Sequence, residues 1–318
     1  MPRFVTVGAA QLGPIARDET RAQVVDRQLA LMHSAHRHGC DLVVFPELAL
    51  TTFFPRWHFE RQDDIDAFFE PAMPGPETRR LFDAARDLRL GFYLGYAELV
   101  AEGARRRHFN TSILVDQTGA VVGKYRKIHL PGHAEHEPWR RFQHLEKRYF
   151  ERGDLGFPVF RATFGDGGPG LYGMAICNDR RWPETYRMMG LQAVEMVLIG
   201  YNTPVHNPPA PEHDALSHFH NELVMQAGAY QNGTWVVGVA KAGCEEGVDQ
   251  IGNSIIVAPS GEIVAACATT GDELALARCD LDLTKSYKNT TFDFARHREP
   301  DQYRLIVERK GAEPPPER

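Results

Sequence analysis

The stretch DLVVFPE at residues 41–47 has a counterpart later in the chain, EMVLIGY at residues 195–201. Both are short and mostly apolar, as expected of β-strands that are buried on both faces. Two more pairs follow in the same order: GFYLGYAE (91–98) with TWVVGVAK (234–241), and SILVDQTGAVV (112–122) with SIIVAPSGEIV (254–264). Buried strands and hairpins often look alike, but the shared order of the matches favours two related β/α halves.

Amphipathic helices are predicted between these strands. Residues 4–11 predict a strand, and residues 19–38 predict a helix with Val25, Leu29 and Met32 on one stripe. Each half can therefore supply one sheet with helices on its outer face. Two such sheets packed face to face form a four-layer α-β-β-α sandwich, and this α/β architecture is the predicted fold class.

The composition is that of an ordinary globular protein. The chain has 318 residues, of which 43% are apolar and 25% charged, with a net charge of −6. This length can form one large core, so a single domain over residues 1–318 is predicted. Acidic and basic residues are interspersed, which argues against a nucleic-acid partner. The basic run Arg105–Arg107 is expected on a solvated loop.

Several further patterns bear on location and cofactors. No window approaches the roughly 20 apolar residues that a membrane span needs, and the N-terminus lacks the apolar core of a signal peptide. The five cysteines are widely spaced and include no CxxC pair, which argues against disulfides or a cysteine zinc site. No GxGxxG or P-loop pattern occurs. We expect a cytoplasmic protein without a cofactor and without a membrane partner.

Three polar residues stand where predicted strands end: Glu47, Lys127 and Cys177. Such positions are the usual place for a functional site in an α/β sheet. A carboxylate can accept the proton of a thiol during attack, and an ammonium stabilises the oxyanion that follows. The three residue types therefore suit acyl transfer from an amide. Each also has an ordinary structural interpretation, as a core cysteine, a helix-start carboxylate or a solvated lysine.

Three segments resemble, in order, the signature segments of the nitrilase, or carbon–nitrogen hydrolase, superfamily: FPELAL (45–50), YRKIHL (125–130) and ICNDRRWPE (176–184). The resemblance extends from about Phe4 to about Leu283. It implies the α-β-β-α sandwich of that superfamily and an enzyme that needs no metal and no cofactor.

The resemblance also implies a role for each matching residue. Glu47 would be the general base, Lys127 the stabiliser of the oxyanion and Cys177 the nucleophile. Glu146 would support the lysine and the substrate. The implied substrate-binding residues are His144, Asn178, Arg180, Arg181, Asn202 and Thr203, with the backbone N–H of Asn178 as a second oxyanion donor.

Within the superfamily the chain most resembles the N-carbamoyl-D-amino acid amidohydrolases, through the segments PELALTTFFPRWHF (46–59), FQHLEKRYFERGDLGFPV (142–159) and GYNTPVHNPP (200–209). This implies hydrolysis of N-carbamoyl-D-amino acids to D-amino acid, carbon dioxide and ammonia. It also implies a homo-oligomer, dimer or tetramer, in which a C-terminal extension from about residue 285 to 318 contacts a partner subunit.

Arginine residues suit the α-carboxylate of such a substrate because a guanidinium can donate two parallel hydrogen bonds. Two arginines, Arg180 and Arg181, follow the predicted nucleophile closely. At least one of them can reach the substrate. An ion pair with Asp179 or Glu184 is about equally expected for the other.

Other functions are compatible with parts of this pattern. A nitrilase, an aliphatic amidase, or an amidase for β-ureido acids or carbamoylated amines would share the same three catalytic residues. A metallohydrolase could use the histidines within residues 129–136 or the pair His218 and His220. However, Pro131 and Gly132 interrupt any helix there and no HExxH occurs, so no metal site is expected. A non-enzymatic interaction protein would require an occluded pocket.

Overall fold

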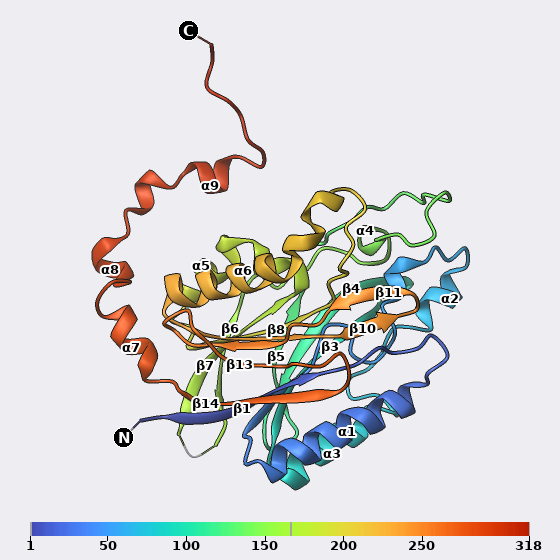
Figure 1. The fold of residues 1–318 in the computed structure, drawn as a ribbon, viewed down its shortest axis with the longest axis horizontal. Coiled ribbons are helices and arrows are strands. Elements are labelled where there is room, and N and C mark those ends of the chain that lie inside the picture. The colour runs from blue at the N-terminus through green and yellow to red at the C-terminus, as the bar shows by residue number, and fades with distance from the viewer. Residues whose placement is uncertain (1, 166, 318) are drawn as a thin grey trace.

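The computed structural model describes residues 2–165 and 167–317, and two six-stranded sheets lie at its centre between layers of helices (Figure 1). The first sheet has the order β14 (Glu273–Asp280), β1 (Phe4–Gln11), β2 (Leu42–Val44), β3 (Gly91–Glu102), β4 (Arg105–Val115) and β5 (Val121–Arg126). The second has the order β13 (Ile263–Ala266), β12 (Ile255–Val257), β9 (Trp235–Ala240), β8 (Met196–Tyr201), β7 (Pro169–Ile176) and β6 (Val159–Thr163). Residues 1, 166 and 318 of the predicted domain lie outside the described residues.

The two sheets share one topology. Strands β1, β2 and β3 pair in parallel, as do β7, β8 and β9. In each sheet the third of these strands continues into two antiparallel strands, and the first has an antiparallel neighbour on its other side. The matched segments 41–47 and 195–201 lead through β2 and β8. The predicted pair of related halves is therefore confirmed.

Helices cover the outer faces of both sheets, which confirms the predicted four-layer α-β-β-α sandwich (Figure 1). Helices α1 (Arg21–Arg37) and α3 (Arg79–Leu88) cover the first sheet, and α5 (Pro183–Gly190) and α6 (Ser217–Asn232) cover the second. Thr20 and Gln23 form a capping box at the start of α1, which satisfies backbone donors that a helix end leaves free.

Shorter elements connect the layers or extend from them. They are η1 (Phe54–Arg56), α2 (Gln62–Asp66), α4 (Glu146–Tyr149), η2 (Cys177–Arg181), η3 (Pro211–Leu216), β10 (Ala242–Glu245), β11 (Val248–Ile251), α7 (Leu283–Lys288), α8 (Phe294–His297), η4 (Pro300–Gln302) and α9 (Leu305–Glu308). The last four form a segment that leads away from the sandwich (Figure 1). None of the described helices is long and apolar enough to span a membrane.

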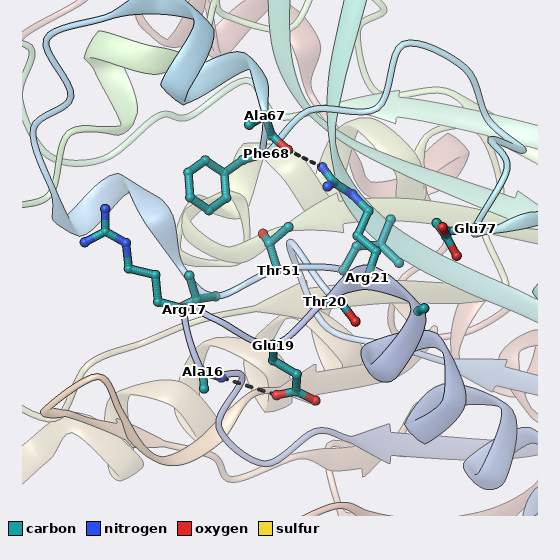
Figure 2. A pocket seen from close by; sticks show the side chains of 12 residues that line it. Ala16, Arg17, Glu19, Thr20, Arg21, Thr51, Ala67, Phe68 and Glu77 are labelled. Carbon is teal, nitrogen blue, oxygen red and sulfur yellow. Dashed lines mark hydrogen bonds between the residues drawn. The ribbon is translucent and has the colours of Figure 1, made fainter.

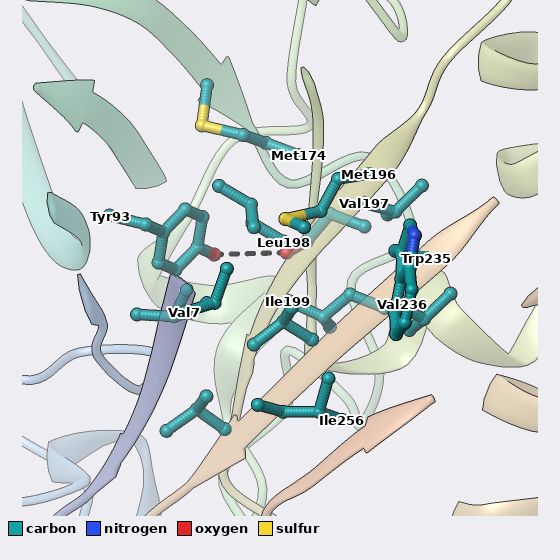
Figure 3. Packing of buried hydrophobic residues seen from close by; sticks show 14 of the residues in the cluster. Val7, Tyr93, Met174, Met196, Val197, Leu198, Ile199, Trp235, Val236 and Ile256 are labelled. Carbon is teal, nitrogen blue, oxygen red and sulfur yellow. Dashed lines mark hydrogen bonds between the residues drawn. The ribbon is translucent and has the colours of Figure 1, made fainter. Parts of the chain in front are cut away.

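The main core lies between the two sheets. Val7 and Tyr93 from the first sheet lie beside Leu198 of the second, and all three are fully buried (Figure 3). The hydroxyl of Tyr93 donates to the carbonyl of Ala175 at 3.0 Å and accepts from the N–H of Gly200 at 3.1 Å. A buried hydroxyl needs such partners, and here they connect the two sheets.

One local prediction is wrong in part. The basic run Arg105–Arg107 does not form a loop but starts β4, although Arg105 and Arg106 are exposed as expected. Arg106 pairs with Asp66 at 2.8 Å, and Arg107 pairs with Glu151 at 3.0 Å. The strand forms here because β4 pairs with the preceding strand β3, in which Glu102 lies opposite Arg105.

Candidate active site

The predicted catalytic residues lie at neighbouring strand ends. Glu47 follows β2, Lys127 follows β5 and Cys177 follows β7. The three residues are 0%, 0% and 2% exposed, respectively. Because the two sheets pack face to face, the ends of strands from both halves meet at one edge of the sandwich.

Glu47 is held between the two sheets at its backbone. A Cβ atom on Gly95 of β3 would lie 2.7 Å from the Cα atom of Glu47, and one on Gly200 of β8 would lie 2.5 Å from its nitrogen. Only glycine permits such close approach. The carboxylate accepts hydrogen bonds from the side chain of Asn110 at 2.8 Å and from the backbone N–H of Asn202 at 2.9 Å. Its orientation is therefore fixed from both halves.

Lys127 lies between two carboxylates. Its ammonium donates to Glu47 at 2.7 Å and to Glu146 at 2.6 Å, and all three side chains are fully buried. Burial opposes the charged lysine, but Glu146 and Glu47 outweigh it and raise the pKa of Lys127. Burial also opposes the charge of Glu146, yet Lys127 and His144 lower its pKa. His144 contacts the other oxygen of Glu146 at 2.9 Å.

Cys177 is the first residue of η2 and directly follows β7, so it lies where the chain turns out of the strand. Its φ angle of 47° lies in the left-handed region that residues other than glycine rarely adopt. The thiol donates to the carbonyl of Asn202 at 3.3 Å, so one residue contacts both the thiol and Glu47. Burial and the charge of Glu47 raise the pKa of Cys177, against the opposing effect of Lys127. The thiol therefore keeps its proton at neutral pH and needs a base to attack.

The two arginines have different surroundings. Arg180 is 1% exposed and donates to Asn221 at 2.9 Å, to the carbonyl of Cys177 at 2.7 Å and to the hydroxyl of Thr203 at 2.9 Å. Its guanidinium carbon also lies 4.2 Å from the ring centroid of Tyr201. The side chain of Arg180 is thus engaged by the protein on several sides.

Arg181 is exposed, and its guanidinium donates to the side-chain oxygen of Asn178 at 3.4 Å. The neighbouring charge of Arg180, together with desolvation, lowers the pKa of Arg181 to about 10. A carboxylate near Arg181 would relieve this repulsion. Asp179, one expected ion-pair partner, instead accepts hydrogen bonds from Tyr125 at 2.8 Å and from His129 at 2.8 Å.

The structure brings all the predicted site residues into adjoining contact networks. Glu47, Lys127, Glu146 and His144 form one chain of contacts, which the backbone of Asn202 connects to Cys177. The second network joins the remaining predicted residues to the turn at Cys177: Asn178, Arg180, Arg181 and Thr203.

Sequence reasoning missed three residues that orient this site: Asn110, Asn221 and Asp179. Asn110 contacts Glu47, Asn221 contacts Arg180, and Asp179 accepts from the backbone N–H of Ile176 at 3.1 Å. Asn110 carries no distinct signal, because β4 (RRRHFNTSILV) has other polar residues near it on both sides. Asn221 carries none either, since polar residues are common on helices. Asp179 lies within the signature segment 176–184, but it was expected only as an ion-pair partner of an arginine.

The histidines that suggested a metallohydrolase have other partners. His129 pairs with Asp179 and stacks on Trp182, with 5.1 Å between ring centroids. His133 contacts the carbonyl of Glu135 at 2.8 Å. Within residues 2–165 and 167–317, no group of three or more His, Cys, Asp or Glu side chains is placed to hold a metal ion.

A pocket of about 410 Å³ opens elsewhere, beside the start of α1 (Figure 2). Arg17, Arg21 and Glu77 lie around it, and Arg21 donates to the carbonyl of Ala67 at 2.7 Å. Among the described residues that line this pocket, none belongs to the predicted catalytic set. The pocket is therefore distinct from the site around Cys177.

The sandwich and the buried cluster at its edge indicate a hydrolase of amide-like bonds, and comparison with known proteins defines the class. Residues 6–289 match the carbon–nitrogen hydrolase family. The chain belongs to this family.

Similar proteins span nearly the whole chain. A tomato (Solanum lycopersicum) protein named N-carbamoylputrescine amidase is 31% identical, over 98% of each chain. A Pyrococcus abyssi protein named nitrilase is 30% identical, over 86% of this chain and 90% of its own. The crystal structure of a carbon–nitrogen hydrolase from Helicobacter pylori has a TM-score of 0.80 at 22% identity, over 96% of this chain and 99% of that one, which supports the fold.

Proposed function

We propose that the chain hydrolyses N-carbamoyl-D-amino acids to D-amino acid, carbon dioxide and ammonia. The observation that carries the substrate class is Arg181, an exposed residue four positions after Cys177 whose guanidinium is repelled by the charge of Arg180. A free α-carboxylate is a fitting partner for such a cation. Preference for the D form rests on the resemblance of residues 46–59 and 142–159 to N-carbamoyl-D-amino acid amidohydrolases.

The proposed reaction begins with attack of Cys177 on the ureido carbonyl. Glu47 accepts the thiol proton, and Lys127 with the backbone N–H of Asn178 stabilises the oxyanion. When the carbon–nitrogen bond breaks, Glu47 returns the proton to the departing nitrogen, which leaves a thioester-like intermediate on sulfur. Glu47 then takes a proton from water, which attacks the carbonyl carbon, and gives it to the departing sulfur to restore the thiol. The carbamic acid released in this step breaks its remaining carbon–nitrogen bond, which yields carbon dioxide and the second amine. One water molecule is consumed overall.

Arg180 and Arg181 receive different roles in this proposal. Arg181 binds the substrate carboxylate, because the residue is exposed and its guanidinium has only one hydrogen bond, to Asn178, among the described residues. Arg180 positions the turn at Cys177, because its donors already bind Cys177, Thr203 and Asn221.

A second candidate is hydrolysis of a carbamoylated amine. It is favoured by the 31% identity to the tomato protein named N-carbamoylputrescine amidase. That substrate carries an ammonium and no carboxylate. The positive charge of Arg181, which forms no ion pair with a carboxylate among the described residues, opposes such a ligand, so we prefer the anionic substrate.

The test is ammonia release from D- and L-N-carbamoyl amino acids and from N-carbamoylputrescine, each at matched concentrations. We expect rapid turnover of the D forms and little of the other two. Turnover of N-carbamoylputrescine alone would replace the proposed substrate with the second candidate. Equal turnover of D and L forms would retain the substrate class and overturn the chirality.

We also propose that the protein forms a homo-oligomer in the cytoplasm. Met188 of α5 and Leu223 of α6 are 47% and 46% exposed, and Val307 of the C-terminal segment is 86% exposed. Exposed apolar side chains on α5, α6 and the C-terminal segment provide apolar surface that a second copy can cover. The cysteines are free, as a thiol nucleophile requires and as a reducing compartment favours.

Light scattering on the full chain and on a chain ending at residue 289 tests the assembly. Equal masses for the two would exclude a role for the C-terminal segment.

A further inference from the structure

A second buried ion cluster lies beside the active site and has no part in the proposed reaction. We call Lys241, Glu245 and Arg56 the anchor cluster; they are 0%, 0% and 4% exposed. Lys241 follows β9 and contacts Glu245 at 2.9 Å, and Arg56 of η1 lies 3.3 Å from the same carboxylate. The backbone N–H of Ile15 also donates to Glu245 at 3.1 Å. The carboxylate is thus surrounded by donors from distant segments.

The anchor cluster holds one segment of chain, residues 51–56. Glu245 accepts from the backbone N–H of Phe53 at 2.8 Å, and Lys241 donates to the carbonyl of Thr51 at 2.9 Å. Arg56 returns a hydrogen bond to the carbonyl of Glu245 at 2.8 Å. This segment begins four residues after Glu47, and the cluster fixes both its beginning and its end.

The same segment supports the residues on the other side of Lys127. The carbonyl of Pro55 accepts from the N–H of Leu145 at 2.8 Å, and the carbonyl of Arg56 accepts from the N–H of Gln143 at 2.9 Å. The ring of Phe53 meets that of His144 edge-on, with 5.7 Å between centroids. Residues 143–145 lead directly to Glu146. The position of Glu146, the second carboxylate of the active site, therefore depends through residues 51–56 on the position of Glu245.

We propose that Glu245 is a positioning residue for catalysis, which acts through residues 51–56 to place His144 and Glu146 against Lys127. A buried ion pair adds little net stability over well-packed apolar residues, because its desolvation offsets its attraction. What such a cluster can supply is one fixed conformation of the chain that it contacts. Displacement of a catalytic group by about 1 Å can lower a rate by about 100-fold, so this support has catalytic consequence.

The inference rests on the proposed function for its substrate but not for its geometry. In Glu245→Gln the shape is kept, while the charge that holds Lys241 and Arg56 is removed. We expect kcat with an N-carbamoyl-D-amino acid to fall by about 10- to 100-fold, with KM changed by less than about 3-fold. The matched control is Glu195→Gln, a carboxylate of 8% exposure that pairs with Arg3 at the opposite end of β8.

A second measurement separates positioning from loss of folding. Alkylation of Cys177 by iodoacetamide, followed by mass spectrometry of its peptide, reports the active site without any substrate. We expect the pH profile of this reaction to shift in Glu245→Gln and in the charge-neutral pair Lys241→Met/Glu245→Gln, but not in Glu195→Gln. If wild type hydrolyses no N-carbamoyl amino acid, the proposed function fails while this profile still tests Glu245.

Coupling with His144 and Glu146 gives the deciding outcome. Because Glu245 acts by placing both His144 and Glu146, adding Glu245→Gln to the double variant His144→Ala/Glu146→Gln should lower kcat by less than about 3-fold further. Fully multiplicative losses would overturn the proposal. So would a Glu245→Gln variant whose kcat and alkylation profile match those of Glu195→Gln.

Discussion

The two halves of the sandwich have the same strand order but contribute different chemistry. The first half and the segment after it supply Glu47, Lys127 and Glu146, which form a buried ionised cluster. The second half supplies Cys177 and Asn202, which meet through a neutral hydrogen bond. In the proposed reaction, proton transfer and charge stabilisation come from one half, and the nucleophile comes from the other. The comparison teaches that a duplicated fold can divide one reaction between its copies and complete it only where they meet.

The largest effect is expected from removing the nucleophile, which the second half supplies. Cys177→Ala should lower kcat by about 10⁴-fold or more, because the covalent path loses its nucleophile. The exposed Cys244 provides a control, and Cys244→Ala should keep wild-type activity. Ammonia release under saturating substrate measures both. Full activity in Cys177→Ala would show that Cys177, and with it the second half, does not supply the nucleophile.

The next largest effect is expected from removing the general base, which the first half supplies. Glu47→Gln retains a side chain that can contact Asn202 and Lys127 but cannot accept the thiol proton. We expect kcat to fall by about 10²- to 10⁴-fold, the range for loss of a general base. Because burial and Glu47 raise the pKa of Cys177, the wild-type thiol should also resist alkylation at neutral pH and react faster as the pH rises. A fall in kcat no larger than that of Glu195→Gln would contradict the assigned base.

A smaller effect is expected from the two arginines of the second half, Arg180 and Arg181, and it tests their different roles. Arg181→Ala should raise KM for an anionic N-carbamoyl amino acid by about 10-fold and leave KM for a neutral amide unchanged. Arg180→Ala should instead lower the free energy of unfolding by about 2–3 kcal/mol, since Asn221 and Thr203 lose a buried partner. Steady-state kinetics and denaturant unfolding distinguish the two. The reverse pattern would exchange the roles of the arginines.

The smallest effect concerns the pH dependence of stability. The lowered pKa of Glu146 contributes stability that is present above the carboxyl's unfolded pKa and is lost as pH falls through its folded value. The raised pKa of Lys127 contributes stability that is lost only at high pH. Glu146→Gln should therefore show a smaller fall in melting temperature on acidification than wild type, by a few °C. Parallel pH profiles for the two proteins would contradict the charged state of this cluster.

The fold could be predicted because its signal is periodic and repeated. Short apolar runs at residues 41–47 and 195–201 indicate buried strands, and their shared order indicates two halves. Contacts between distant charges left no such signal. Arg106 forms an ion pair with Asp66, 40 residues earlier, and nothing near either residue in the sequence reveals the partner.

The site was predictable in its residue types but not in its geometry. Strand ends identified Glu47, Lys127 and Cys177 as candidates, and the family resemblance assigned their roles. The different surroundings of Arg180 and Arg181 could not be predicted from two adjacent arginines in the sequence. They depend on which guanidinium contacts Asn221 of α6. The anchor residue Glu245 was likewise invisible, since its partners are spread from Ile15 to Lys241.

Acid quenching of wild type during turnover of an N-carbamoyl-D-amino acid, followed by peptide mass spectrometry, tests the central division most directly. We expect a substrate-derived adduct on Cys177 that is absent from Cys177→Ala and strongly reduced in Glu47→Gln. An adduct on another residue, or an undiminished yield on Cys177 in Glu47→Gln, would contradict the pairing of a nucleophile from one half with a base from the other.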